Sequence, residues 1–125
     1  MIKLTLEQIL ELHALVIKET GGSIGLRDLG RLESSIATQT QNVFGEELYP
    51  KIEDKSAAII RSIIADHPFV DGNKRTAMIT GLTLLILNNK HFQFRPGEIE
   101  DFAVNIAIEH LDVPKISIWL KAHII

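Results

Sequence analysis

Side chains that could bind phosphate or move a proton are concentrated in one nine-residue segment, His67-Pro68-Phe69-Val70-Asp71-Gly72-Asn73-Lys74-Arg75. Histidine is the usual general base near neutral pH, so His67 is the candidate for removing a proton from a hydroxyl group. Asp71 offers hard carboxylate oxygens, and Mg²⁺ is usually held by one or two carboxylates together with substrate phosphates. The two residue types point to chemistry on a substrate that carries phosphate.

The second half of the segment favours an anion. A helix is predicted to begin at about Lys74, and the first amides of a helix have no partners within it, while its dipole attracts negative charge. Lys74 and Arg75 add positive charge on that turn, and a guanidinium can hold two phosphate oxygens. Gly72 lets a ligand approach the backbone, and Asn73 is a good N-cap. We therefore expect Gly72, Asn73, Lys74 and Arg75 to bind phosphates, with Mg²⁺ at Asp71.

A purely structural interpretation of the same residues is also open. Asp-Gly-Asn is a common connection between helices. A histidine at a helix C-terminus is an ordinary partner of the helix dipole, and Lys or Arg on a first turn can simply be solvated. Residue types and spacing alone therefore suggest a phosphate site without deciding for it.

Two predicted helices position the segment. Apolar residues at helical spacing predict helices over residues 53–66 and 74–89, and Pro68 disfavours helical geometry at His67, where the first one ends. The second is apolar on nearly every side, which is typical of a helix at the centre of a bundle. Four more are expected around it: residues 6–20 with a Thr5/Gln8 capping box, residues 29–39 capped by Asp28, one from after Pro96 to about residue 110, and one capped by Asp112.

The rest of the chain is short connections. Residues 40–50 have no helical period and predict a loop or small hairpin, and residues 91–94 a short extended piece. We find no repeat, linker or low-complexity tract. The predicted fold is all-α, a single domain over residues 1–125 with about six helices around a central buried helix.

Composition narrows the class of protein. A chain of 125 residues with 46% hydrophobic residues can bury one core. The absence of cysteine excludes disulfides, zinc–thiolate sites and cysteine nucleophiles. The net charge of −3, with scattered Lys and Arg, lacks the basic footprint of a nucleic-acid-binding protein. Neither a signal peptide nor a membrane span is predicted, so we expect a cytoplasmic protein.

The nine-residue segment resembles the Fic motif, H-x-F-x-(D/E)-x-N-(G/K)-R, at all seven specified positions. Residues 25–35, Gly-Leu-Arg-Asp-Leu-Gly-Arg-Leu-Glu-Ser-Ser, resemble the Doc branch of that family, the death-on-curing toxins. Length and helix order are similar to that branch across nearly the whole chain. The resemblance implies that His67 deprotonates the target hydroxyl, that Asp71 holds Mg²⁺, and that Asn73, Lys74 and Arg75 hold the nucleotide phosphates with the helix amides.

Two positions distinguish the branches of the family. Enzymes that transfer AMP typically have Gly where this chain has Lys74, and a second Arg where it has Met78. Both differences are similar to Doc-like toxins. That resemblance implies a kinase that binds ATP in the reverse sense, phosphorylates a threonine of elongation factor Tu and so stops translation. It also implies a cognate antitoxin that lays a C-terminal segment into a groove on the toxin.

Two other functions stay open at this stage, namely AMP transfer by the same site and a non-catalytic module whose helical groove captures a partner segment. The resemblance also implies a flap near the active site that aligns the target by strand pairing, and we expect residues 40–50 to form it. We expect structural or surface roles for His13, His91, His110 and His123, and a core or groove position for Trp119. Arg27, Asp28 and Glu33 are expected to form a cap and an ion-pair network.

Overall fold

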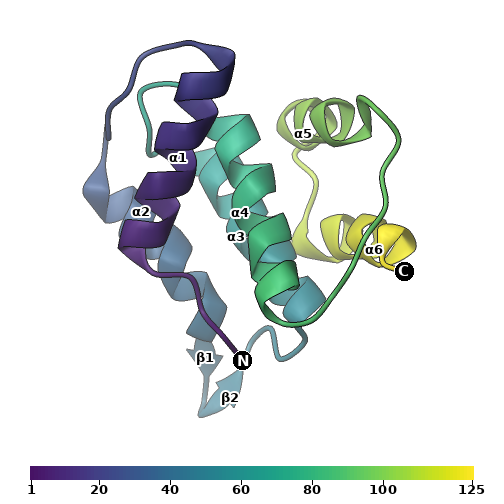
Figure 1. The fold of residues 1–125 in the computed structure, drawn as a ribbon. Coiled ribbons are helices and arrows are strands. Elements are labelled where there is room, and N and C mark those ends of the chain that lie inside the picture. The colour runs from purple at the N-terminus through teal and green to yellow at the C-terminus, as the bar shows by residue number, and fades with distance from the viewer.

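The protein, described by a computed structural model of residues 1–125, consists of six α-helices, one turn of 3₁₀ helix and a short hairpin (Figure 1). The α-helices are α1 (Leu6–Thr20), α2 (Leu29–Ala37), α3 (Ile52–Asp66), α4 (Asn73–Leu87), α5 (Glu98–Glu109) and α6 (Val113–His123). The 3₁₀ turn η1 (Thr38–Thr40) follows α2, and strand β1 (Asn42–Val43) pairs with β2 (Glu46–Glu47) in antiparallel. The predicted all-α class and helix order are confirmed.

Three helices begin where their caps predict. Thr5 and Gln8 form the capping box of α1. The carboxylate of Asp28 accepts the amide of Arg31 at 3.1 Å at the start of α2, and Asp112 caps α6 in the same way. Each cap satisfies an amide that the helix leaves without a partner, so local sequence is enough to fix these starts.

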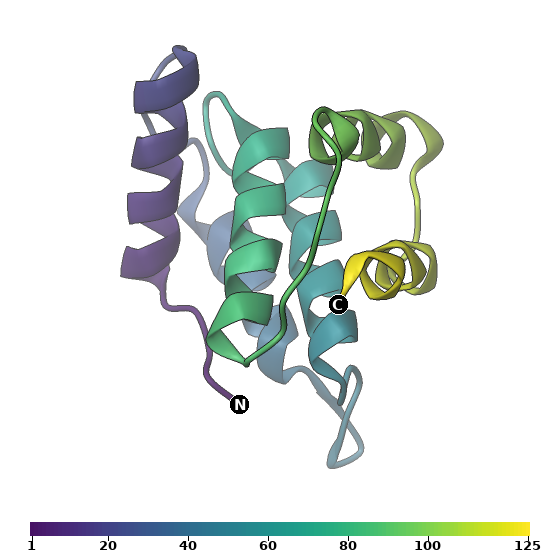
Figure 2. The ribbon, with the colours of Figure 1, turned by 45° about the vertical axis from the view of Figure 1, so that its right-hand side comes forward.

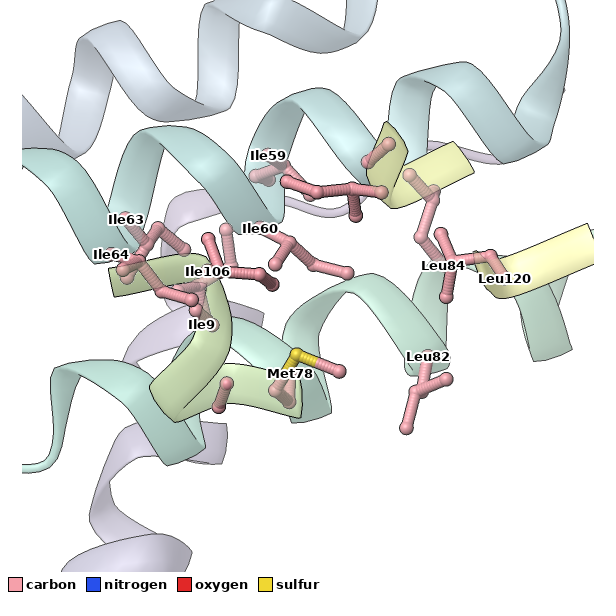
Figure 3. Close-up of a cluster of buried hydrophobic side chains, with 14 of the residues drawn as sticks. Ile9, Ile59, Ile60, Ile63, Ile64, Met78, Leu82, Leu84, Ile106 and Leu120 are labelled. Carbon is pink, nitrogen blue, oxygen red and sulfur yellow. The ribbon is translucent and has the colours of Figure 1, made fainter. Parts of the chain in front are cut away.

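The core is built around α4, which packs against α3, α1 and α5 (Figure 2). Buried isoleucines of α3 lie against Met78 and Leu84 of α4, with Ile106 of α5 and Leu120 of α6 completing the cluster (Figure 3). The two central helices approach closely at Gly81, because a Cβ atom there would collide with the side chain of Ile60. The prediction of a central buried helix is confirmed.

Several helix ends differ from the predictions by one or two residues. α2 ends at Ala37 and continues only as η1, and α4 ends at Leu87, because Asn89 takes a left-handed conformation with φ 64°. The predicted N-cap of α4 is wrong. Gly72 holds that position, and Asn73 is the first residue of the helix, with its side chain directed elsewhere.

The hairpin and the α3–α4 loop lie at opposite ends of the domain (Figure 1). The hairpin precedes the N-terminal end of α3 and His67 follows its C-terminal end, so the 15 residues of α3, about 22 Å of helix, separate them. Residues 40–50 do form a small hairpin, but the prediction that it lies near the active site is wrong.

The C-terminal residues pair through their backbone with residues 91–93. Phe92 forms an antiparallel bridge with Ile124, and the amide of Gln93 donates to the carbonyl of His123 at 2.9 Å. The short extended piece predicted over residues 91–94 therefore exists, and it pairs with the C-terminal residues. None of the helices combines the length and the apolar character that crossing a bilayer requires.

Candidate active site

His67 directly follows the last residue of α3 and begins the loop that leads to α4. It caps α3 in a left-handed conformation, φ 48° and ψ 59°, and its amide donates to the carbonyl of Ile63 at 3.1 Å. Its carbonyl accepts Arg27 Nε at 2.9 Å, so its hydrogen bonds all involve the backbone. The residue is exposed, and its imidazole makes no hydrogen bond within the protein.

Phe69 anchors the loop in the core. It is 1% exposed, and its ring stacks on that of His13 with centroids 3.8 Å apart and planes 7° from parallel. His13 Nε2 lies 2.9 Å from the carbonyl oxygen of Asp71 and donates to it. The predicted structural role of His13 is thus correct, but its contact with the site was missed. Its position among Ile9, Val16 and Ile17 on the buried face of α1 was the available signal.

Asn73 closes the loop by pairing with the backbone of Phe69. The amide of Phe69 donates to Asn73 Oδ1 at 2.9 Å, and Asn73 Nδ2 donates to the carbonyl of Phe69 at 3.0 Å. Both ends of the carboxamide are engaged, which explains why it does not cap α4. The second N–H of Asn73 Nδ2 makes no hydrogen bond within the protein.

The connection between α1 and α2 runs beside the loop. The amides of Arg27 and Asp28 donate to the carbonyl of Pro68 at 2.7 and 3.0 Å, and the amide of Val70 donates to that of Gly25 at 3.0 Å. Leu26 and Phe69 form an antiparallel bridge. Residues 22–28, rather than the hairpin, therefore form the extended segment next to His67, and we call them the α1–α2 brace.

Two arginines, one from the brace and one from α2, donate hydrogen bonds to the C-terminal end of α3. Arg27 Nη2 and Arg31 Nη1 donate to the carbonyl of Asp66 at 3.2 and 2.9 Å. Asp28 caps α2 as predicted, but the predicted ion-pair network is wrong: Arg27 and Glu33 take part in none of the four ion pairs. Asp28 Oδ2 lies 3.4 Å from Arg31 Nε instead. Cations suit a helix C-terminus, and these arginines hold the backbone from which His67 projects.

Asp71 presents its carboxylate at the surface while the backbone orients it. Oδ1 accepts the amide of Gly72 at 2.9 Å and Oδ2 accepts the amide of Ser23 at 3.2 Å. Each oxygen keeps a lone pair, so the carboxylate fits a role as one ligand of a divalent cation. No cluster of three or more His, Cys, Asp or Glu residues is present. A magnesium ion here would need substrate phosphates as further ligands.

The first turn of α4 presents free donors. Gly72 has φ 72° and caps the helix without a side-chain bond, and Thr76 is the first residue whose amide is satisfied within the helix, by the Gly72 carbonyl at 3.0 Å. The amides of Asn73, Lys74 and Arg75 are therefore open. The side chains of Lys74 and Arg75 are exposed and belong to none of the four ion pairs.

Residues 3–85 match the model of the Fic/DOC family. The chain belongs to this family. The compact all-α domain around a central helix is consistent with the Fic fold.

Two characterised relatives are Doc proteins. The chain is 34% identical over 99 residues to "Toxin Doc" of Mycolicibacterium smegmatis, covering 78% of this chain and 76% of that protein. It is 31% identical over 115 residues to "Protein kinase doc" of Escherichia phage P1, covering 92% of this chain and 90% of that protein. Similarity of this extent places the chain near the Doc members of the Fic/DOC family.

Two hollows lie beside the motif residues 67–75. One, of about 460 Å³, lies between α1, α4 and α5, with Lys74 and Arg75 on its wall and seven apolar residues among the eleven that line it. Glu19 and Glu100 also line it. The other, of about 160 Å³, lies on the far side of His67, between the C-terminal ends of α3 and α5. Lys74 and Arg75 thus line the larger groove, and His67 lines the smaller pocket.

Proposed function

We propose that this chain is a Doc-like toxin that transfers the γ-phosphate of Mg·ATP to a serine or threonine hydroxyl of a protein target. The observation that carries the proposal is the group of free donors at the start of α4, directly after the loop that presents His67 and Asp71. The match to the Fic/DOC family and the printed names of the two relatives support it.

Phosphate binding rests on charge and open amides. Three consecutive backbone donors at a helix N-terminus form an anion site, and Lys74 and Arg75 stand beside them without protein partners. Arg75 can hold two oxygens of one phosphate, whereas Lys74 contributes a point charge. A triphosphate would bring charge that this turn can neutralise.

His67 acts as general base in the proposed reaction. It removes the proton of the target hydroxyl while that oxygen forms a bond to the γ-phosphorus. The bond between the γ-phosphorus and the β–γ bridging oxygen breaks, ADP leaves, and the proton stays on His67 until solvent removes it. The exposed imidazole needs no rearrangement to meet a hydroxyl, because only its backbone is engaged.

Asp71 would hold the magnesium ion, whose contribution is to neutralise charge on the phosphates. The hydrogen bonds from Gly72 and Ser23 fix the position of the carboxylate without consuming its second lone pairs. One carboxylate plus phosphate oxygens is an ordinary ligand set for Mg²⁺.

The target segment would pair with the α1–α2 brace. One edge of the brace bonds to the loop through Gly25 and Arg27, which leaves the backbone of Ile24 and Leu26 on the other edge for an extended peptide. Ile24 is 71% exposed, so its side chain could also contact such a peptide. We propose elongation factor Tu as the target and the cytoplasm as the place of action, in keeping with the Doc resemblance.

The larger groove is our proposed site for a cognate antitoxin. Its apolar wall suits the apolar face of a helical segment. An occupant would also lie against Lys74 and Arg75 and compete with the nucleotide for them. Neutralisation would then follow from occupation of the phosphate site.

The experiment that tests the proposal is transfer of label from ATP. With purified elongation factor Tu, label in the γ-phosphate should appear on the target and label in the α-phosphate should not. Lys74→Gly should reduce γ-transfer at least about tenfold, since it removes a charge-assisted contact. Lys115→Gly, an exposed lysine on the first turn of α6, is the control and should transfer normally.

The alternative is AMP transfer, in which the hydroxyl attacks the α-phosphorus and pyrophosphate leaves. The same anion site could hold ATP in the orientation that AMP transfer requires. The two reactions then differ only in which phosphorus atom faces His67. Transfer of α-label by the wild-type protein would replace the kinase proposal with this one. Absence of transfer from either position would favour a non-catalytic binding module.

A further inference from the structure

His13 of α1 has no assigned part in the reaction, although its ring meets the motif loop at two points. The residue is 3% exposed, its ring stacks on Phe69, and Nε2 lies 2.9 Å from the carbonyl oxygen of Asp71. A carbonyl oxygen only accepts hydrogen bonds, so Nε2 must carry the proton. We propose that His13 is a positioning residue for the phosphoryl transfer proposed above, on which this inference rests. It holds the Asp71–Gly72 peptide in the orientation that the metal ligand needs.

The Asp71–Gly72 peptide is held on both sides. Its oxygen accepts the hydrogen bond from His13, and its N–H, which belongs to Gly72, donates to Asp71 Oδ1 at 2.9 Å. The peptide group is planar, and its C=O and N–H point in opposite directions. Fixing the oxygen against α1 therefore fixes the direction of the N–H. That N–H is one of the two amides that hold the Asp71 carboxylate, the other being that of Ser23.

The glycine at position 72 makes such a lock necessary. Glycine populates positive and negative φ about equally, so rotation of this peptide from the observed φ of 72° to negative φ meets little intrinsic resistance. The rotation would turn the Asp71 carbonyl oxygen toward its own carboxylate, where two acceptors repel, and would take the Gly72 N–H away from Oδ1. A larger residue would crowd α1, because a Cβ atom at Gly72 would lie 3.1 Å from Ile17 Cδ1.

Phe69 fixes the plane of the His13 ring. The two rings lie 7° from parallel with centroids 3.8 Å apart, and the backbone of Phe69 is itself held by Asn73 at 2.9 and 3.0 Å. Stacking alone would be served equally well by a phenylalanine at position 13. The donor at the edge of the ring is what reaches the Asp71 carbonyl, so substitution can separate the two contributions.

Two variants of the full chain separate the ring from the donor. His13→Phe keeps an aromatic ring against Phe69 and removes the N–H, whereas His13→Gln carries an N–H on a side chain of similar length. Titration calorimetry should show Mg·ATP binding weakened about tenfold by His13→Phe, as for loss of one hydrogen bond, and clearly less by His13→Gln. His123→Phe is the control and should bind Mg·ATP normally. His123 also stacks on an aromatic ring, and its Nδ1 donates to the carbonyl of Trp119 at 2.8 Å.

A double-mutant cycle tests whether His13 acts through the Asp71 carboxylate. In the Asp71→Asn background, His13→Phe should change Mg·ATP affinity less than about twofold, because the charge that it positions is already gone. A merely structural role would cost the same in both backgrounds. In the nucleotide-free protein, the NMR signal of the Gly72 amide proton should move upfield in His13→Phe, since its hydrogen bond to the carboxylate is lost, and should stay in place in His123→Phe.

The wild-type protein alone can also overturn the assignment. The nitrogen chemical shifts of the His13 ring should show a proton on Nε2, and a neutral ring protonated on Nδ1 would exclude the lock. An unmoved Gly72 amide in His13→Phe, equal losses of affinity in both backgrounds, or a His13→Gln variant as weak as His13→Phe would exclude it as well. Failure of the proposed function would look different, as absence of γ-label transfer by a wild-type protein whose Gly72 amide still depends on His13.

Discussion

At the scale of single residues, His67 combines an exposed ring with a strained backbone position. His67→Ala should lower the rate of target labelling about 10²–10⁴-fold, the usual contribution of a general base. The fold should persist, because the ring makes no hydrogen bond that the protein needs. Labelling at the wild-type rate would exclude His67 as the base.

His110→Ala is the matched control for stability. His110 also caps a helix in a left-handed conformation, with φ 51° against 48° for His67. The two substitutions should lower the melting temperature by similar amounts, since each places Ala in the same unfavourable region. A much larger loss for His67→Ala would mean that its ring stabilises the loop.

Asp71 should matter for metal-nucleotide binding far more than for folding. Asp71→Asn keeps an oxygen acceptor for one backbone amide but removes the negative charge. Titration calorimetry should show Mg·ATP binding weakened at least about tenfold, while the unfolding midpoint changes little. Asp101→Asn, exposed on α5, is the control. Unchanged affinity in the Asp71 variant would leave this residue a structural role only.

At the scale of elements, the α1–α2 brace fixes Asp71 from outside the motif. A Cβ atom at Gly22 would lie 2.6 Å from Asp71 Oδ2, whereas one at Gly21 would meet nothing within 4 Å. Gly22→Ala should therefore displace the carboxylate and weaken Mg·ATP binding. Gly21→Ala should leave this affinity unchanged, although both glycines have positive φ, 110° and 77°. Calorimetric titration of both variants with Mg·ATP separates the effect of the collision with Asp71 from the effect of backbone strain.

The contact between the N-terminal end of α5 and the C-terminal end of α6 should respond to pH. His123 Nδ1 donates to the carbonyl of Trp119, which raises the pKa of His123, and the Glu98 carboxylate raises it further although burial opposes this. The amide of Arg95 and then His123 lower the pKa of Glu98, against a smaller opposing effect of burial. Both ring nitrogens face acceptors, so the imidazolium is the form that the site binds.

The two shifts define a window of stabilisation. A raised pKa of His123 contributes stability fully below its ordinary value of 6.5 and loses it as pH rises through the folded-state value. A lowered pKa of Glu98 contributes above its ordinary 4.5 and is lost as pH falls through the folded-state value. The pair should stabilise most between these values. His123→Gln should flatten the fall in unfolding free energy above pH 6.5, measured by urea titration, and His91→Gln should not.

At the scale of the whole molecule, the sequence predicts elements better than their contacts. Helix existence, order and the Thr5, Asp28 and Asp112 caps were predictable because each depends on neighbours within one turn. The motif loop was predictable because its functional residue types are adjacent in sequence. The approach of residues 22–28 to residues 68–70 was not, since it joins segments about 40 positions apart with no periodicity to reveal it.

Asn73 and His13 show the same limit at the site. Asparagine is favoured both as a helix cap and as a side chain that pairs with loop backbone, and only the tertiary path of the loop decides between these uses. His13 sits at an ordinary helical spacing. Its role depends on Phe69, 56 positions later, packing flat against it.

The distance of the hairpin from the site suggests that the chain can be cut at the hairpin tip without disturbing the site. Phe44 and Gly45 at its tip are exposed, and the site lies at the other end of α3. A cut between them would leave one fragment with His13 and the brace and another with the entire motif. We expect neither fragment alone to poison a cell. Their buried surfaces should let them recombine, and under the proposed toxin function growth inhibition would then require co-expression of both fragments.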